Sequence, residues 1–250
     1  MANFKPLKNY LLVLIDDLIN EYNAQGPFLD VGCGVGDITA HLAQQGWSGT
    51  AIDISPTAIK AARANLQNYP QINIEQKPAS AIQDKFSTVL ACDIIEHVDD
   101  DNALMSQLSH LTVPNGKLII STPIFMSEWR WDDEFYGHVR RYEIPKLINL
   151  LHRHNFRVLA IWDFTFPVFW LIRRIYTHLI PKKFIIPDKK SNTLKSATNN
   201  AWDYGLLTTL FTKIIYWRPI FWLQKRFRNH LAGCECVLIA QRVDSNSKDK

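Results

Sequence analysis

A glycine-rich stretch near the start of the chain carries residues that can bind a polar ligand. An apolar segment runs into Gly32, Gly34 and Gly36, and a helix-like segment follows. Glycine permits backbone conformations and close approaches that a Cβ atom prevents, so the N–H groups before that helix can face a ligand. Asp30 adds a carboxylate beside the loop. Asp53 ends the next apolar segment about 20 residues later, where nucleotide-binding α/β folds place a ribose-binding acid.

The spacing of the glycines separates two classes of cofactor. The dinucleotide fingerprint is G-x-G-x-x-G, whereas Gly36 comes one position early for it. Asp30 would repel a pyrophosphate but suits a ligand with an ammonium group. The pattern D-V-G-C-G-x-G, followed by Asp53, resembles the class I S-adenosylmethionine (SAM)-dependent methyltransferases. This resemblance implies SAM as the cofactor, with Asp53 on its ribose; the alternative is a tight glycine turn with a surface aspartate.

A second motif follows the fourth apolar segment. Residues 92–98, C-D-I-I-E-H-V, resemble the D-x-x-E-H-V segment of ubiquinone-type and related small-molecule methyltransferases. The resemblance implies that Asp93 and Glu96 face the cofactor ammonium and that His97 faces the acceptor. The alternative is that both acids cap the next helix and His97 packs in the turn. We expect the acids at 99–101 to favour the positive end of that helix rather than to bind a cation, and we predict no metal site.

The adenine contact departs from the family pattern. The family often has an acid after the third strand, but the aligned position here is near Pro78, so Ser80, Ala79 or backbone must contact the adenine. The resemblance therefore assigns the cofactor to Asp30, Gly32, Cys33, Gly34, Gly36, Asp53, Ile54, Ser80 and Asp93.

Residues 137–142, G-H-V-R-R-Y, resemble a G-H-x-R-R-Y segment found in a subgroup of bacterial SAM-dependent methyltransferases. His138 can act as general base for an acceptor hydroxyl. Arg140 and Arg141 can hold a carboxylate or phosphate, although alternation puts only one of them on the inner face. The alternative is a salt bridge to an acid of 132–134. We predict His138 as the catalytic residue; the predicted acceptor contacts are His97, Trp129, Arg140, Arg141 and Tyr142.

The elements that must position these residues alternate along the chain. This order predicts a parallel, Rossmann-like α/β sheet with helices on both faces, and the resemblance implies a seventh, antiparallel strand beside strand six. Ligands bind beyond the carboxyl ends of such strands, so the segment 124–142 is well placed to cover a substrate. The predicted strands are 28–31, 49–54, 72–76, 88–95, 117–122, 156–161 and 236–243.

A basic, aromatic segment interrupts the pattern between strands six and seven. We predict a SAM-binding domain formed by 1–164 and 233–250, with a helical insertion at 165–232. Basic residues greatly outnumber acids in the insertion, and the rest of the chain is net acidic. Aromatic residues beside lysine and arginine suit a helix in an anionic membrane interface; the alternative is a helical cap with solvated charges. No nucleic-acid-binding motif is present, so no nucleic acid is expected as a partner.

The cysteines and the distribution of apolar residues bear on where the protein works in the cell. The four cysteines lack the spacing of a disulfide or metal framework, which favours reduced thiols. The sequence shows no secretory signal and no apolar run as long as a membrane span. We therefore expect a cytoplasmic protein, peripheral at the inner face of the membrane.

These patterns together predict a SAM-dependent methyltransferase. Its acceptor atom would be an oxygen, less readily a nitrogen, of a small or amphiphilic molecule such as a lipid, a quinone precursor or a lipid-linked saccharide. The alternative is a non-catalytic SAM-binding protein that uses the insertion as a membrane or regulatory module. The glycine spacing disfavours a nicotinamide oxidoreductase.

Overall fold

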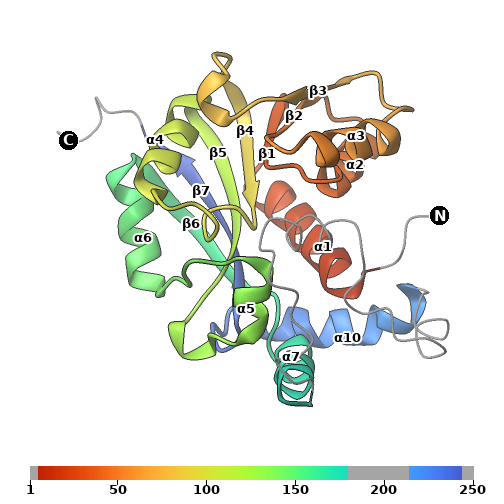
Figure 1. Cartoon of the computed structure of the whole chain (residues 1–250), viewed down its shortest axis with the longest axis vertical. Helices are drawn as coiled ribbons and strands as arrows, with labels where there is room; N and C mark the ends of the chain where they lie inside the picture. The colour runs from red at the N-terminus through yellow and green to blue at the C-terminus, as the bar shows by residue number, and fades with distance from the viewer. Residues whose placement is uncertain (1–4, 180–213, 244–250) are drawn as a thin grey trace.

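The computed structural model describes residues 5–179 and 214–243, and its described strands form one sheet of seven in the order β3-β2-β1-β4-β5-β7-β6 (Figure 1). Neighbouring strands are parallel except around β7, which runs antiparallel between β5 and β6. This topology confirms the predicted sheet, including its antiparallel last strand. The strands are β1 (Phe28–Val31), β2 (Gly49–Asp53), β3 (Ile72–Gln76), β4 (Phe86–Cys92), β5 (Thr112–Pro123), β6 (Phe156–Asp163) and β7 (Glu235–Arg242).

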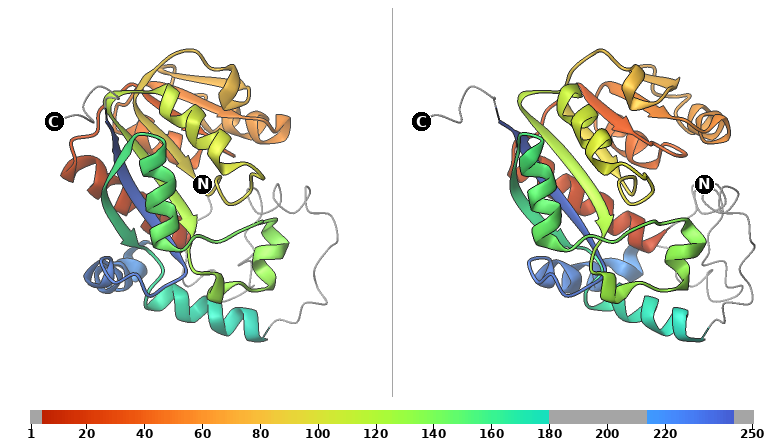
Figure 2. Two further views of the ribbon diagram at one scale, coloured as in Figure 1. Left: turned by 90° about the vertical axis from the view of Figure 1, so that its left-hand side faces the viewer. Right: turned by 60° about the vertical axis from the view of Figure 1, so that its left-hand side comes forward.

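Helices cover both faces of the sheet (Figures 1 and 2). Apolar side chains of α1, α2, α3, α7 and α10 join one core cluster, and those of α4 and α6 join a second cluster on the other face. Alternate residues of the central strands enter one cluster or the other, as expected for strands buried on both sides. The helices are α1 (Pro6–Glu21), α2 (Asp37–Gln44), α3 (Pro56–Asn65), α4 (Asp101–Leu111), α5 (Trp131–Tyr136), α6 (Ile144–Arg153), α7 (Val168–Leu179) and α10 (Ile214–Phe227), with short 3₁₀ turns η1 (Ala79–Ala81) and η2 (Met126–Glu128).

Side-chain caps begin two of the helices. Ser55 accepts a 3.3 Å hydrogen bond from a backbone N–H in the first turn of α3. Asp100 does the same for α4, at 2.9 Å. The acids at 99–101 thus serve the start of a helix, as expected. The alternative in which Asp93 and Glu96 cap this helix is wrong, because Asp100 occupies the cap position.

Strand β5 departs from its predicted bounds. It pairs with β4 from Thr112 and resumes regular pairing at Lys117, so the residues between them bulge out of the ladder. Asn115 lies in this bulge with φ +62°. Strand β5 therefore begins at Thr112, ahead of its predicted start at 117.

The predicted insertion is described at its two ends, as α7 and α10, while 180–213 lie outside the described residues. Both helices pack on the N-terminal helix: the ring of Tyr10 lies 6.2 Å from that of Phe169 and 5.1 Å from that of Phe221, between centroids. In α10, Lys225 Nζ lies 2.7 Å from an oxygen of Asp17. These contacts are those of a cap on the core.

The structure bears on the membrane prediction in two ways. Among the described residues, no helix combines the length and the apolar character needed to cross a membrane. Helix α7 nevertheless exposes a row of apolar side chains at helical spacing, with Leu171, Ile175 and Leu179 each at least half exposed. Contact with a membrane surface stays a prediction.

Candidate active site

In the loop between β1 and α2, Gly32 and Gly34 require the absence of a side chain for different reasons. Gly32 has φ +69°, and a Cβ atom there would lie 2.1 Å from Cδ1 of Ile94 in the loop after β4. Gly34 has φ +56°, and a Cβ atom there would meet nothing within 4 Å. Gly32 therefore lets two loops approach each other, whereas Gly34 borders open space that a ligand can fill.

Asp53 ties the end of β2 to this loop. One of its carboxylate oxygens accepts a 2.9 Å hydrogen bond from the backbone N–H of Gly34, and the other accepts a 2.8 Å bond from that of Ser55. The next residue, Ile54, is 73% exposed, and Ser80 on η1 is also exposed. A carboxylate beside an exposed apolar side chain fits a ribose with its attached base.

Asp30 is the buried acid of the loop. Its side chain is 2% exposed and accepts a 2.6 Å hydrogen bond from the hydroxyl of Thr39 on α2. Burial raises the pKa of Asp30 to about 6, although that hydrogen bond and the nearby Lys8 oppose the rise. The ammonium of Lys8 lies 3.0 Å from Asp37, so this region already accommodates one positive charge. The donor set thus fits the ammonium and ribose of SAM; the thiol of the predicted contact Cys33 is buried.

The turn after β4 carries two further acids. Asp93 has φ +56°, an uncommon conformation for a residue other than glycine, and accepts a 2.6 Å hydrogen bond from Ser121. Glu96 is 1% exposed, and its Oε2 accepts a 3.3 Å hydrogen bond from Thr122. Its Oε1 is buried with no hydrogen-bond partner in the described structure. Burial, with the nearby charge of Asp93, raises the pKa of Glu96 well above its usual range.

Two histidines meet beside this turn. The rings of His97 and His138 lie 4.9 Å apart between centroids, edge to face. His138 places Nδ1 2.8 Å from Oδ1 of Asp133, and His97 places Nδ1 3.3 Å from the carbonyl of Gly137. Because a carboxylate only accepts, His138 donates from Nδ1 and keeps a lone pair on Nε2 when neutral. Burial, together with the neighbouring His138, lowers the pKa of His97.

The two arginines of the motif point in different directions. Arg141 is buried and donates to Asp133 (2.8 Å) and to the carbonyls of Ile124 (3.0 Å) and Cys234 (2.8 Å). Arg140 instead pairs with Asp101 at 2.7 Å and lies on the outer side. The open alternative, a salt bridge to an acid of α5, therefore describes Arg141, which leaves it no evident role on a substrate.

The predicted acceptor contacts do not all converge. His138 lines a small cavity together with Tyr136 and Phe169, and the Arg141 side chain forms part of its wall. Arg140 and Tyr142 line a second groove beside α6, which Arg141 also borders. The hydroxyl of Tyr142 donates to Asp101 at 2.9 Å, and Trp129 is half-buried after η2. The structure thus brings His97 and His138 together, with Arg141 in the wall of the same cavity, and places Trp129, Arg140 and Tyr142 elsewhere.

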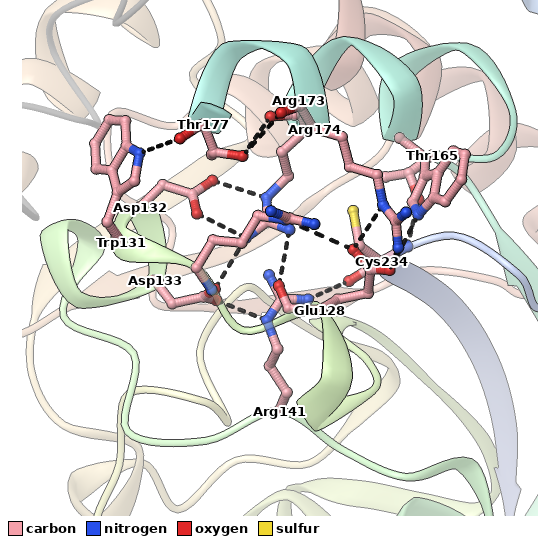
Figure 3. Close-up of polar contacts among 12 residues, drawn as sticks. Glu128, Trp131, Asp132, Asp133, Arg141, Thr165, Arg173, Arg174, Thr177 and Cys234 are labelled. Carbon is pink, nitrogen blue, oxygen red and sulfur yellow. Dashed lines mark hydrogen bonds and ion pairs between the residues drawn. The ribbon is translucent and has the colours of Figure 1, made fainter. Parts of the chain in front are cut away.

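A network of ion pairs joins the segment after β5 to α7 (Figure 3). Arg173 forms two 2.7 Å hydrogen bonds to Asp132 and one of 2.9 Å to Asp133. Arg174 pairs with Glu128, and the indole of Trp131 donates to a carbonyl of α7 at 2.9 Å. Figures 1 and 2 show α5 and α7 together beyond the carboxyl ends of the parallel strands.

Asp133 is the centre of this network. It accepts from His138, Arg141 and Arg173. Burial opposes its ionisation, but the hydrogen bonds of His138 and Arg141 outweigh burial and lower the pKa of Asp133 to about 2. Sequence reasoning missed Arg173 as a partner. The available signal was a cluster of acids at 128–134 and the pair of arginines at 173–174, on the helix after β6.

A sequence model of the methyltransferase domain family matches residues 7–161. The match covers more than half of the chain, and together with the sheet topology it defines the class: the chain belongs to the methyltransferase domain family, among the class I SAM-dependent methyltransferases.

Curated relatives are ubiquinone biosynthesis O-methyltransferases. The protein from Xylella fastidiosa (strain M23) is 35% identical over 127 residues, which cover 47% of this chain and 50% of the relative. The mitochondrial protein from Schizosaccharomyces pombe is 27% identical over 174 residues, which cover 67% of this chain and 52% of the relative. The chain spans about half the length of the curated relatives it matches.

Solved structures share the fold at low identity. The [4+2]-cyclase SpnF has a TM-score of 0.59 at 15% identity, over 93% of this chain and 80% of its own. The magnesium protoporphyrin IX methyltransferase of Synechocystis PCC 6803, solved with bound SAM, has a TM-score of 0.53 at 14% identity, also over 93% and 80%. These neighbours confirm the predicted fold. The family confirms the predicted class, whose cofactor is SAM; the roles of individual residues stay predictions.

Proposed function

We propose that the chain transfers the methyl group of SAM to an oxygen atom of a small or amphiphilic acceptor. The observation that carries this proposal is the Asp133–His138 pair, 2.8 Å apart, beside the loops that fit the cofactor. An imidazole held at Nδ1 by a carboxylate is a suitable base for a hydroxyl group. The names of the curated relatives, which are O-methyltransferases, also favour oxygen as the acceptor atom.

Each side of the site has its own task. Bound SAM supplies an electrophilic methyl group. The glycine loop and Asp53 hold the ribose end, and Asp30 balances the ammonium. His138 accepts the hydroxyl proton at Nε2 as the new C–O bond forms, and the charge of Asp133 stabilises the resulting imidazolium. The protein mainly aligns the two reactants and excludes water.

The surroundings of His138 support an acceptor with an apolar part. Its cavity includes Leu7 from α1, and Phe169 and Tyr176 from α7. Helix α7 also carries the exposed apolar row of Leu171 and Ile175. A lipid, a quinone precursor or a lipid-linked saccharide combines a hydroxyl group with such an apolar portion.

The test incubates the full chain with methyl-labelled SAM and an extract of small molecules and lipids. We expect label in the extract, in a product whose new methyl group is bound to oxygen. The variant Asp53→Ala should lose the transfer because it loses the cofactor, whereas Asp84→Ala, a change at an exposed aspartate before β4, should retain it. Tight binding of S-adenosylhomocysteine (SAH) without label transfer would favour the non-catalytic alternative.

A further inference from the structure

We propose that Glu235, the first residue of β7, binds the acceptor by donating a hydrogen bond to a neutral oxygen atom, such as a carbonyl or ether oxygen. This role rests on the proposed function and deepens it, because it adds a contact that selects among acceptors. No sequence motif singled out Glu235, which lies one residue ahead of the predicted strand 236–243.

The antiparallel direction of β7 brings Glu235 to the edge of the sheet where the site lies. Glu235 pairs with Pro123, the last residue of β5. The carboxyl ends of the parallel strands meet at this edge, where open α/β sheets bind their ligands. Glu235 lines the same cavity as His138, together with Phe169 and Tyr176 of α7. An acceptor whose hydroxyl group meets His138 therefore has Glu235 within reach.

The carboxyl group of Glu235 is partly buried and has no hydrogen bond or ion pair to any residue that the structure describes. Both guanidinium groups in the cavity wall are engaged with other partners. Arg141 donates to Asp133 and to two backbone carbonyls. Arg173 donates to Asp132 and Asp133 (Figure 3). Glu235 is thus left to bond with a group that enters the cavity.

The surroundings of Glu235 favour its protonated form. Burial, with the nearby charge of Asp93, raises the pKa of Glu235 well above its usual range, although Arg141 and Arg173 oppose the rise. The group therefore carries a proton at neutral pH. A protonated carboxyl group has one O–H to donate, whereas an ionised carboxylate only accepts. Glu235 thus offers a hydrogen-bond donor to the cavity.

The charge balance of the cavity indicates a neutral ligand group. Arg141 and Arg173 offset the two acids of α5 that they contact, so the wall has no net charge while Glu235 is protonated. A charged ligand group would find no free partner of opposite sign there. A carbonyl or ether oxygen only accepts hydrogen bonds and so matches the O–H of Glu235. An acceptor without such an oxygen would leave the O–H unpaired, which weakens its binding.

The experiment measures label transfer from methyl-labelled SAM over a dilution series of the same extract of small molecules and lipids. Glu235→Met keeps the length of the side chain but has no donor. It should raise the apparent KM about three- to tenfold, the usual contribution of one neutral hydrogen bond, and leave kcat within about twofold. Glu235→Gln keeps an N–H donor and should stay within about twofold of the wild type in both constants.

Glu21→Ala is the matched control. Glu21 is the last residue of α1 and forms an ion pair with Arg228, whereas Leu7, near the start of that helix, lines the cavity. A helix of 16 residues spans about 24 Å, so Glu21→Ala should leave the KM unchanged. Thermal unfolding and the SAH affinity of each preparation show that the variants are folded and bind the cofactor. If Glu235→Met does not fold, Glu235→Ala takes its place in the comparison.

Two results would overturn the role of Glu235 alone. One is an unchanged KM in Glu235→Met. The other is a KM in Glu235→Gln as high as in Glu235→Met, because it would show that the carboxylate acts through its charge. Absence of label transfer by the wild-type chain would instead refute the proposed function, and this role with it.

Discussion

The cofactor side and the acceptor side of the site are built in different ways. On the cofactor side, Asp30, Gly34 and Asp53 lie within one short stretch of sequence, and their contacts join neighbouring strands. On the acceptor side, Asp133 is contacted by Arg173 from α7, and Arg141 by the carbonyl of Cys234 beside β7. A local motif therefore fixes the first side, whereas the second is held together by ion pairs between distant segments.

We expect the largest effect, a loss of stability, from a substitution that breaks the ion pairs of the acceptor side. Arg173→Met removes the cation that meets two buried acids, Asp132 and Asp133. Breaking a buried pair by removing one partner costs about 3–5 kcal/mol of the free energy of unfolding. Urea denaturation measures this loss. Arg140→Met, at a more exposed pair with Asp101, is the control and should cost about 1 kcal/mol or less. Equal losses of unfolding free energy in Arg173→Met and Arg140→Met would contradict the role of α7 in holding the acceptor side together.

A smaller effect is expected on the cofactor side, in binding instead of folding. Asp53→Ala removes a carboxylate that holds the Gly34 N–H and faces the ribose. A hydrogen bond to a charged group contributes about 1.5–3 kcal/mol, so the affinity for SAH should fall by roughly one to two powers of ten. Calorimetry measures the affinity. An unchanged SAH affinity would remove Asp53 from the cofactor site.

Acidification should weaken cofactor binding through Asp30. Its pKa is about 6, so it is mostly ionised at pH 7 and mostly protonated at pH 5. A neutral Asp30 no longer attracts the ammonium, and the SAH affinity should fall about tenfold between these two values. Asp30→Asn should bind weakly at both and show a flatter profile. A wild-type profile that does not change around pH 6 would refute this role.

The sequence predicted the two sides to different extents, for a physical reason. Glycine spacing and the alternation of apolar segments are local signals, and the strands β1 to β3 appear within a few residues of their predicted bounds. The position of β7 came from the family resemblance, because periodicity alone does not order strands. Nothing local connects Asp133 with Arg173, since 40 residues separate them and only the packing of α7 brings them together.

Burial separates the two arginines of the G-H-V-R-R-Y motif. Both arginines have the same chemistry in the sequence, and only the structure separates the buried Arg141 from the outward Arg140. Likewise, the sequence left the role of His97 open, and only the structure shows that His138 lies beside it. Residues whose role depends on a neighbour from another segment were the ones the sequence left open.

The most direct test of the account compares two properties of one variant, His138→Ala. If His138 serves the acceptor side alone, methyl transfer should fall by about 10²–10⁴-fold, the usual contribution of a positioned acid or base. The affinity for SAH, measured on the same preparation, should stay within about twofold of the wild type. Unchanged transfer, or a loss of SAH affinity as large as that of Asp53→Ala, would contradict the separation of the two sides.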